Sequence, residues 1–162
     1  MSTQVTTLSE KLGEAINNSL FSVLQTLRNL DEKKAKLKPQ PEKWSHIETL
    51  GHLTDSAINN QQRIVRAMLE PHTEAKGYKQ NDWVNAVNYR TFDWKMLLSV
   101  WMNLNYLLAS TVQEIPEAAL SHTISIDGNA PITLQFLIED YNAHLQNHLK
   151  QIIPNASFNH LL

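Results

Sequence analysis

Prolines mark the boundaries of this chain's regular stretches. The six prolines among the 162 residues stand between segments of helical periodicity and interrupt none of them. A proline inside a helix removes a backbone hydrogen bond and clashes with the preceding turn, so prolines placed this way indicate where helices end. Because the chain also has only four glycines, the pattern favours a few long helices over many short strands.

Four amphipathic helices follow from apolar residues at three- and four-residue spacing. Their expected ranges are 6–30, 45–69, 92–114 and 133–153. Ser45 and Glu48 have the spacing of a capping box, and Thr91 and Thr133 are expected to cap the third and fourth helices. The chain is predicted to form one all-α domain over residues 1–162. Its fold is expected to be a four-helix bundle with a long crossover between helices 2 and 3.

The segments between the helices carry weaker signals. Residues 72–90 are polar and are expected to be irregular, with a short helix around 82–87. Residues 122–128 alternate like a short strand or extended arm that turns at Asp127 and Gly128. Gly51 lies inside the second helix, where glycine costs about 1 kcal/mol relative to alanine. Its presence there predicts that a neighbouring element approaches the helix closely.

Composition excludes several classes of function. The chain has no cysteine, which rules out disulfides, thiolate-ligated zinc and a nucleophilic protein thiol. Fourteen basic residues against sixteen acidic ones, with no basic patch, give no sign of a nucleic-acid-binding protein.

Location and assembly are inferred from the same composition. Residues 96–109 form the most apolar stretch, which is too short to span a membrane, and the first ten residues do not resemble a signal peptide. We therefore expect a cytoplasmic protein. Apolar residues on the first and third helices suit either the bundle core or a homodimer contact.

Two histidines near the C-terminus are the strongest candidates for chemistry. His144 and His148 are four residues apart and therefore lie on one face of a helix. His148 falls within the apolar stripe of that helix and His144 at its edge, so both imidazoles are expected to face a groove between helices. Their spacing suits one metal ion, although such pairs are more often incidental. Leu145 follows the first histidine where a zinc protease would have glutamate, so the zinc-protease motif is absent.

A third ligand is less certain from periodicity. His52 on the second helix shares a side with Glu48 and Asp55, away from the apolar stripe, which favours a surface histidine. The remaining histidines are expected to be solvated or to cap helices: His46, His72, His122 and His160.

Two longer segments resemble a known family. Residues 43–53 (KWSHIETLGHL) and 140–152 (DYNAHLQNHLKQI) are similar to the DinB/YfiT-like family of metal-dependent enzymes. Residues 78–83 (YKQNDW) and 133–137 (TLQFL) resemble the stretches that the family has between them. The resemblance runs from about residue 44 to residue 153. It implies a four-helix bundle in which His52, His144 and His148 bind one divalent metal ion, zinc or nickel.

The implied chemistry is that of an open metal site. Three protein ligands leave room for a further group, which is typical of catalytic rather than structural sites. The resemblance favours a thiol-dependent S-transferase that joins a small-molecule thiol, such as a bacillithiol- or glutathione-like one, to an electrophilic substrate. A metal-dependent hydrolase is one alternative, and a non-catalytic metal- or ligand-binding stress protein is another.

Several other side chains are candidates for supporting roles. Three carboxylates could orient the imidazoles: Glu48, Asp55 and Asp140. Arg63 and Lys150 are candidate contacts for an anionic cosubstrate. Trp83, in the crossover, could either close over the site or pack beneath its own loop.

Overall fold

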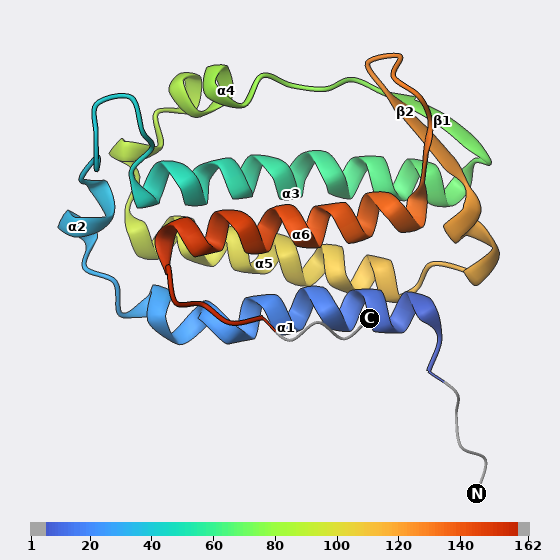
Figure 1. Cartoon of the computed structure of the whole chain (residues 1–162), viewed down its shortest axis with the longest axis horizontal. Helices are drawn as coiled ribbons and strands as arrows, with labels where there is room; N and C mark the ends of the chain where they lie inside the picture. Colours follow the sequence, from blue (N-terminus) through green and yellow to red (C-terminus); the bar gives the residue numbers. More distant parts are fainter. Residues whose placement is uncertain (1–5, 159–162) are drawn as a thin grey trace, which may run out of the picture.

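Four long helices dominate the computed structural model, which describes residues 6–158 (Figure 1). They are α1 (Leu8–Arg28), α3 (His46–Leu69), α5 (Trp94–Gln113) and α6 (Leu134–Ile152). The shorter helical elements are α2 (Glu32–Lys36), α4 (Gln80–Val87), η1 (Tyr89–Thr91) and η2 (Glu117–Ser121). The predicted all-α four-helix bundle is confirmed, as is the short helix in the crossover. Within the described part of the chain, no helix is long and apolar enough to cross a membrane.

The order of the helices around the bundle differs from their order along the chain. α1 packs against α5 and α6, and α3 packs against the same two helices, so α1 and α3 face each other across the diagonal. Neighbouring helices α3 and α5 run in the same direction (Figure 1). A parallel pair cannot be joined by a short turn, and the chain therefore returns along the outside of the bundle through α4. This is the predicted long crossover between the second and third long helices.

A small sheet fastens the crossover to the bundle. β1 (His72–Ala75) pairs in parallel with β2 (Thr123–Ile126), and β2 pairs antiparallel with β3 (Ile132–Thr133). The extended arm predicted at 122–128 is confirmed, and its turn has positive φ at Asp127 (53°) and Gly128 (71°). The expectation of irregular structure at 72–75 was wrong. Those residues form a strand by pairing with β2, which lies about 50 residues later in the chain. A partner so distant leaves no local sequence pattern, which is why the strand was not predicted.

Helix caps explain where the long helices begin. The capping box is present: Ser45 N–H donates to the Glu48 carboxylate at 2.8 Å, and Glu48 N–H donates to Ser45 Oγ at 3.4 Å. Thr133 caps α6 as predicted. The predicted cap of the third long helix was wrong, because Asp93 caps α5 and Thr91 belongs to η1. A carboxylate two residues nearer the apolar run accepts the first-turn amide hydrogen bond instead.

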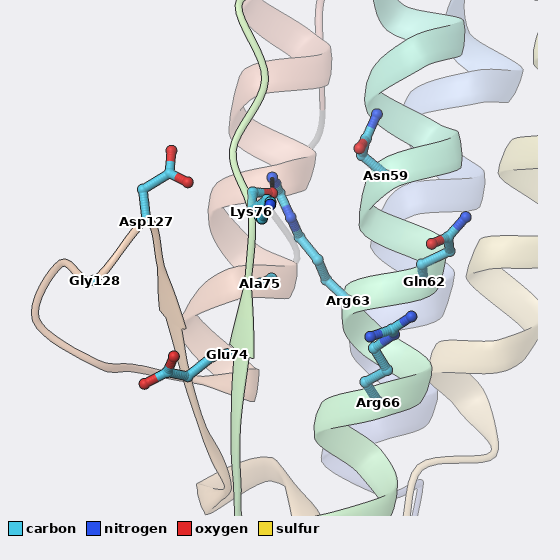
Figure 2. A pocket seen from close by; sticks show the side chains of 9 residues that line it. All are labelled: Asn59, Gln62, Arg63, Arg66, Glu74, Ala75, Lys76, Asp127 and Gly128. Atoms are coloured by element: carbon cyan, nitrogen blue, oxygen red, sulfur yellow. Dashed lines mark hydrogen bonds between the residues drawn. The ribbon is translucent and has the colours of Figure 1, made fainter.

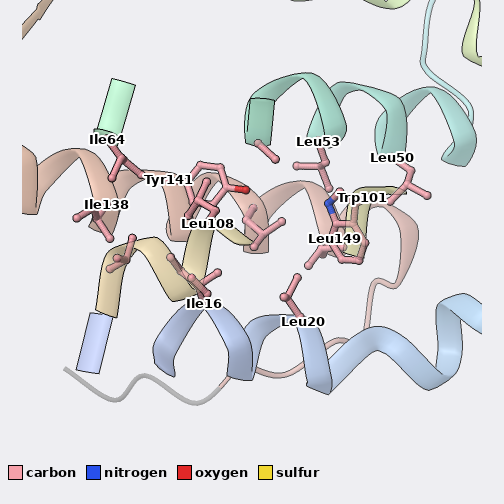
Figure 3. Close-up of a cluster of buried hydrophobic side chains, with 14 of the residues drawn as sticks. Ile16, Leu20, Leu50, Leu53, Ile64, Trp101, Leu108, Ile138, Tyr141 and Leu149 are labelled. Atoms are coloured by element: carbon pink, nitrogen blue, oxygen red, sulfur yellow. The ribbon is translucent and has the colours of Figure 1, made fainter. Parts of the chain in front are cut away.

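The core lies where the four long helices meet (Figure 3). Its fully buried side chains come from all of them: Ile16, Leu20, Leu50, Leu53, Ile64, Trp101, Leu108, Leu145 and Leu149. Gly51 marks the close approach predicted for it, because a Cβ atom there would lie 2.1 Å from Cδ2 of Tyr89. The Tyr89 hydroxyl donates a 2.6 Å hydrogen bond to the buried Asp55. The end of the crossover is thereby pressed against α3 beside His52.

Candidate metal centre

The three histidines singled out in the sequence meet between α3 and α6. His52 lies in the second turn of α3, and His144 and His148 lie on successive turns of α6. One ring nitrogen from each falls within 4.8 Å of the others. The Nε2 atoms of His52 and His144 are 3.1 Å apart, and the ring centroids of His144 and His148 are 4.5 Å apart. The structure therefore brings together residues from positions about 90 apart in the sequence.

His52 is buried, with no exposed surface. The periodicity that favoured a surface histidine was misleading, because the side of α3 that carries Asp55 and Ser56 is also buried. Residues of the crossover cover it, with Tyr89 packed on Gly51. A helix that is covered on two sides has no single apolar stripe, so amphipathicity alone assigns its second buried side to solvent.

Trp44 covers the histidine cluster from the chain segment that precedes α3. Its ring centroid lies 5.0 Å from that of His52 and 6.2 Å from that of His148. Sequence reasoning gave Trp44 no role at the site. Its position one residue before the capping box, at the end of α3 that carries His52, was the available signal.

The surroundings of the cluster favour neutral imidazoles. Burial, helped by the nearby His148 and His144, lowers the pKa of His52 to about 3. Burial also lowers the pKa of His144, against an opposing effect of Asp140. Burial lowers the pKa of His148, although its hydrogen bond to Gln151 acts in the other direction. A neutral imidazole offers a lone pair, which is the form in which histidine binds metals.

The donor set fits a divalent metal ion. Two nitrogens that bind zinc tetrahedrally at roughly 2.0–2.1 Å stand about 3.3 Å apart, close to the 3.1 Å between His52 and His144. Nδ1 of His148 lies 3.2 Å from Oε1 of Gln151. When Nδ1 carries the ring proton and donates it to that oxygen, Nε2 keeps the lone pair that can bind a metal ion. Nδ1 of His52 is buried without a hydrogen-bond partner among residues 6–158.

The carboxylates expected to orient the imidazoles are engaged elsewhere or make no hydrogen bond to them. Glu48 is held in the capping box and lies 3.6 Å from Lys38. Asp55 accepts from Tyr89. Asp140 influences the pKa of His144 through its charge, but it forms no hydrogen bond with the ring among the described residues. Gln151, on the helix turn after His148, forms the hydrogen bond to a ring instead. Its place on the same side of the helix follows from the sequence, but sequence reasoning gave it no role.

The other histidines do not join the cluster. His72 bonds through Nδ1 to Oγ1 of Thr123 at 2.9 Å, and His122 bonds to the backbone oxygen of Ala67 at 2.7 Å, near the C-terminal end of α3. His46 is half-buried in the first turn of α3, where burial lowers its pKa. His72 is exposed and His122 contacts the end of α3, as expected, whereas His46 is neither fully solvated nor a cap, since Ser45 caps α3. His160 lies outside the described residues.

Two separate cavities reach the cluster from different sides. One, of about 250 Å³, ends at His144 and lies between α3, α6 and the crossover. Its polar lining comprises Ser56, Asn60, Arg63, Tyr78, Gln80 and Asp140. The other, of about 670 Å³, ends at His148 beside Trp44. Lys43, His46 and Asn81 contribute to its wall. His144 and His148 thus each form part of the wall of a different cavity.

Three further candidates have different positions. Trp83 packs on Tyr78, with ring centroids 4.8 Å apart, so it supports the loop that forms one wall of the smaller cavity. Lys150 points to the other side of α6, where its ammonium lies 5.7 Å from the ring of Phe158. Arg63 lines the smaller cavity, as a contact for an anion would.

Solved structures with a similar fold include the following two. YfiT from Bacillus subtilis, described as a probable metal-dependent hydrolase with an unusual four-helix bundle topology, matches with a TM-score of 0.80 and 16% identity over 95% of this chain and 89% of that one. A mycothiol-dependent maleylpyruvate isomerase matches with a TM-score of 0.67 and 15% identity over 85% of this chain. The match spans 58% of the isomerase. At these identities the likeness is one of fold.

Comparison of sequences identifies the family. No curated protein sequence matches the chain significantly. The family model of the DinB superfamily matches residues 21–152, which include most of the bundle and all three clustered histidines. This chain belongs to the DinB superfamily.

Proposed function

We propose that this protein is a metal-dependent enzyme whose metal ion is held by His52, His144 and His148. The proposal is supported by three lone-pair nitrogens within 4.8 Å of one another and by the low pKa of the most buried ring. A divalent ion bound there, zinc or nickel, would make a thiol or water in its open position more acidic.

We further propose thiol-dependent transfer as the reaction, in which a small-molecule thiol is joined to an electrophilic substrate. The observation that carries this proposal is the pair of separate cavities, one ending at His144 and the other at His148. A transferase must hold two organic molecules at one centre, whereas a hydrolase needs room for one and water. The thiol must come from a cosubstrate, because the chain has no cysteine.

The protein's own residues would bind and shield the reactants. Trp44 lies against the rings of His52 and His148 and gives the larger cavity an apolar wall beside the cluster. Burial raises the pKa of Tyr78, so its hydroxyl remains a hydrogen-bond donor at neutral pH and can hold an oxygen of a ligand in the smaller cavity. Asp140 in the same cavity is exposed and can accept a proton and pass it to solvent.

Metal-dependent hydrolysis is the second candidate. It is supported by the match to YfiT, which is described as a probable metal-dependent hydrolase and is covered over 89% of its length. The isomerase match supports a thiol, since that enzyme is described as mycothiol-dependent, but it covers a smaller share of its protein. A non-catalytic metal-binding protein is the third reading.

Metal content tests the foundation that both enzymatic readings share. Protein purified without a histidine tag should contain about one divalent ion per chain by elemental analysis, which also identifies the metal. His148→Ala should lose it. His46→Ala is the matched control, because His46 lines the same cavity without joining the cluster, and this variant should keep the metal. Absence of metal from the unmodified protein would reject every metal-dependent reading.

Activity then separates the candidates. A panel of low-molecular-weight thiols is assayed with a chromogenic electrophile, using the unmodified protein, His148→Ala and, as an activity control, His72→Ala, since His72 is exposed and lines neither cavity. Transfer that requires both metal and thiol, and that only His148→Ala abolishes, would support the transferase. Turnover that needs metal but proceeds without thiol would reject it in favour of hydrolysis. A metal-loaded protein without turnover on any pair would favour the binding protein.

A further inference from the structure

Arg63 stands at the boundary between two hollows on the crossover side of α3. It lines the cavity of about 250 Å³ that ends at His144, and it also lines an outer hollow of about 650 Å³ near the turn at Gly128. Figure 2 shows its side chain leaving α3 toward the crossover and reaching Lys76. Any molecule that extends from the histidine cluster along the smaller cavity therefore meets a guanidinium at the far end.

The guanidinium has donors to spare. One Nη2 hydrogen bond goes to the backbone oxygen of Lys76 at 2.9 Å, whereas an arginine has five N–H groups. Among residues 6–158, no carboxylate oxygen lies within 4.0 Å of the Arg63 nitrogens; the two ion pairs in this part of the chain are Lys36–Glu32 and Lys38–Glu48. The ring of Tyr78 lies 6.0 Å from Cζ and supports the group from the crossover. Burial lowers the pKa of Arg63 and the charge of Asp127 opposes this effect, but the Asp127 carboxylate accepts from Gly77 N–H and forms no ion pair with Arg63 among the described residues. A half-buried, fork-shaped cation that is not already paired with a carboxylate is suited to bind one.

The cavity extends beside α3 and has room for a small molecule. His52, Ser56, Asn60 and Arg63 occur at three- and four-residue intervals and therefore follow one side of α3. His52 and Arg63 are separated by about 16 Å of helix. Both side chains reach back toward the N-terminus of α3, and Arg63 is the longer, so the guanidinium lies somewhat closer to the His52 ring than this rise along the helix. The volume lies just below the roughly 300–1,000 Å³ of pockets for drug-sized ligands.

We propose that Arg63 determines specificity by binding a carboxylate at the end of the ligand in this cavity that lies away from the histidines. Asp140 lines the same cavity, but it is exposed and its charge is screened by water. Ser56 and Asn60, both buried, offer neutral polar contacts along the way. The assignment deepens the proposed function by naming the chemical class of one reactant. Binding of a carboxylate by Arg63 does not depend on that function, whereas the identification of the bound molecule as a reactant does.

Binding of a matched pair of probes tests the proposal without turnover. The probes are 4-phenylbutyrate and its neutral amide, 4-phenylbutyramide, titrated calorimetrically into the full chain as purified and after chelation. The unmodified protein should bind the acid at least about tenfold more tightly than the amide, as a charge-assisted pair implies. Arg63→Gln should reduce this preference to less than about threefold, with the amide affinity unchanged, and Arg63→Lys should fall between.

Arg66→Gln is the matched control, because Arg66 lies on the same helix and lines only the outer hollow. It should keep the full preference for the acid. Thermal unfolding of each variant shows whether the fold is intact, and the Arg63 Nε–H nuclear magnetic resonance signal should shift with the acid alone. A preference unchanged in Arg63→Gln, an equal loss in Arg66→Gln, or tighter binding of inorganic phosphate would overturn the assignment. Since the chelated protein is included, this result and the metal-content result can fail independently.

Discussion

Replacing Gly51 with alanine should destabilise the bundle, although alanine is the better helix former. A Cβ atom at position 51 would lie 2.1 Å from Cδ2 and 2.2 Å from Cγ of Tyr89. Cγ is the ring atom nearest the backbone, so the ring cannot swing aside while the crossover keeps its place. The Tyr89 hydroxyl would then leave Asp55, which is 3% exposed and has a second carboxylate oxygen already without a partner among the described residues.

Three contributions determine the size of the effect. Forcing an extra methyl group into a packed site costs about 1–3 kcal/mol. Leaving the buried Asp55 without its hydrogen bond costs about 1–3 kcal/mol more. Alanine returns about 1 kcal/mol in helix propensity. The free energy of unfolding should fall by about 3 kcal/mol, which corresponds to a decrease in Tm of about 6–12 °C for a chain of this size.

Urea and thermal unfolding of chelated protein, followed by circular dichroism, measure this loss without a contribution from bound metal. Tyr89→Phe isolates the hydroxyl and should cost only the hydrogen-bond part. The double variant Gly51→Ala, Tyr89→Ala removes the clash. Its decrease in the free energy of unfolding should therefore be smaller than the sum of the decreases for Gly51→Ala and Tyr89→Ala measured separately. A Gly51→Ala protein as stable as the unmodified one would refute the close approach of Tyr89.

Three further perturbations have defined outcomes. Because burial lowers the pKa of His52 to about 3 from an unfolded value near 6.5, the unfolded chain binds the extra proton between these values. Above pH 6.5 His52 is neutral in the folded and the unfolded chain, so its ionisation does not change stability. As pH falls from 6.5 toward 3, the free energy of unfolding of the chelated protein should decrease by up to about 1.4 kcal/mol per pH unit, measured from urea midpoints. Tyr141→Phe deprives buried Asn105 of its donor and should lower the free energy of unfolding by about 1–3 kcal/mol in the same assay. Asp93→Ala removes the cap of α5 and should cost about 1 kcal/mol by thermal unfolding, whereas Thr91→Ala should cost less.

Local pattern predicted the helices because their signals lie within a few residues of one another. The capping box at Ser45 and the cap at Thr133 fixed two helix starts correctly. The third start was missed because Thr91 and Asp93 both suit a cap, and only the packing of η1 decides between them. β1 could not be predicted for a different reason. A four-residue strand paired with residues about 50 positions away has no local signal of its own.

The candidate site was only partly accessible to the same reasoning. The four-residue spacing of His144 and His148 made them recognisable from the sequence. The burial of His52 was not recognisable, because it depends on the crossover that packs over α3 and not on the residue pattern of α3 itself. Resemblance to the family supplied that position. Trp44, Gln151 and Tyr78 were not recognised as parts of the site, because their roles depend on how the ends of helices and the loop after β1 meet in space.

The diagonal placement of α1 and α3 has a consequence for how the chain acquires its structure. Helices that are consecutive in an up-and-down bundle pair as local hairpins, whereas here α1 must wait for α5 and α6 before it gains its main partners. Folding rates fall as contacting residues become more distant in sequence, so refolding should be slow for a helical protein. The histidine cluster forms only when α6 docks against α3. A chain that ends before α6 would retain His52 alone.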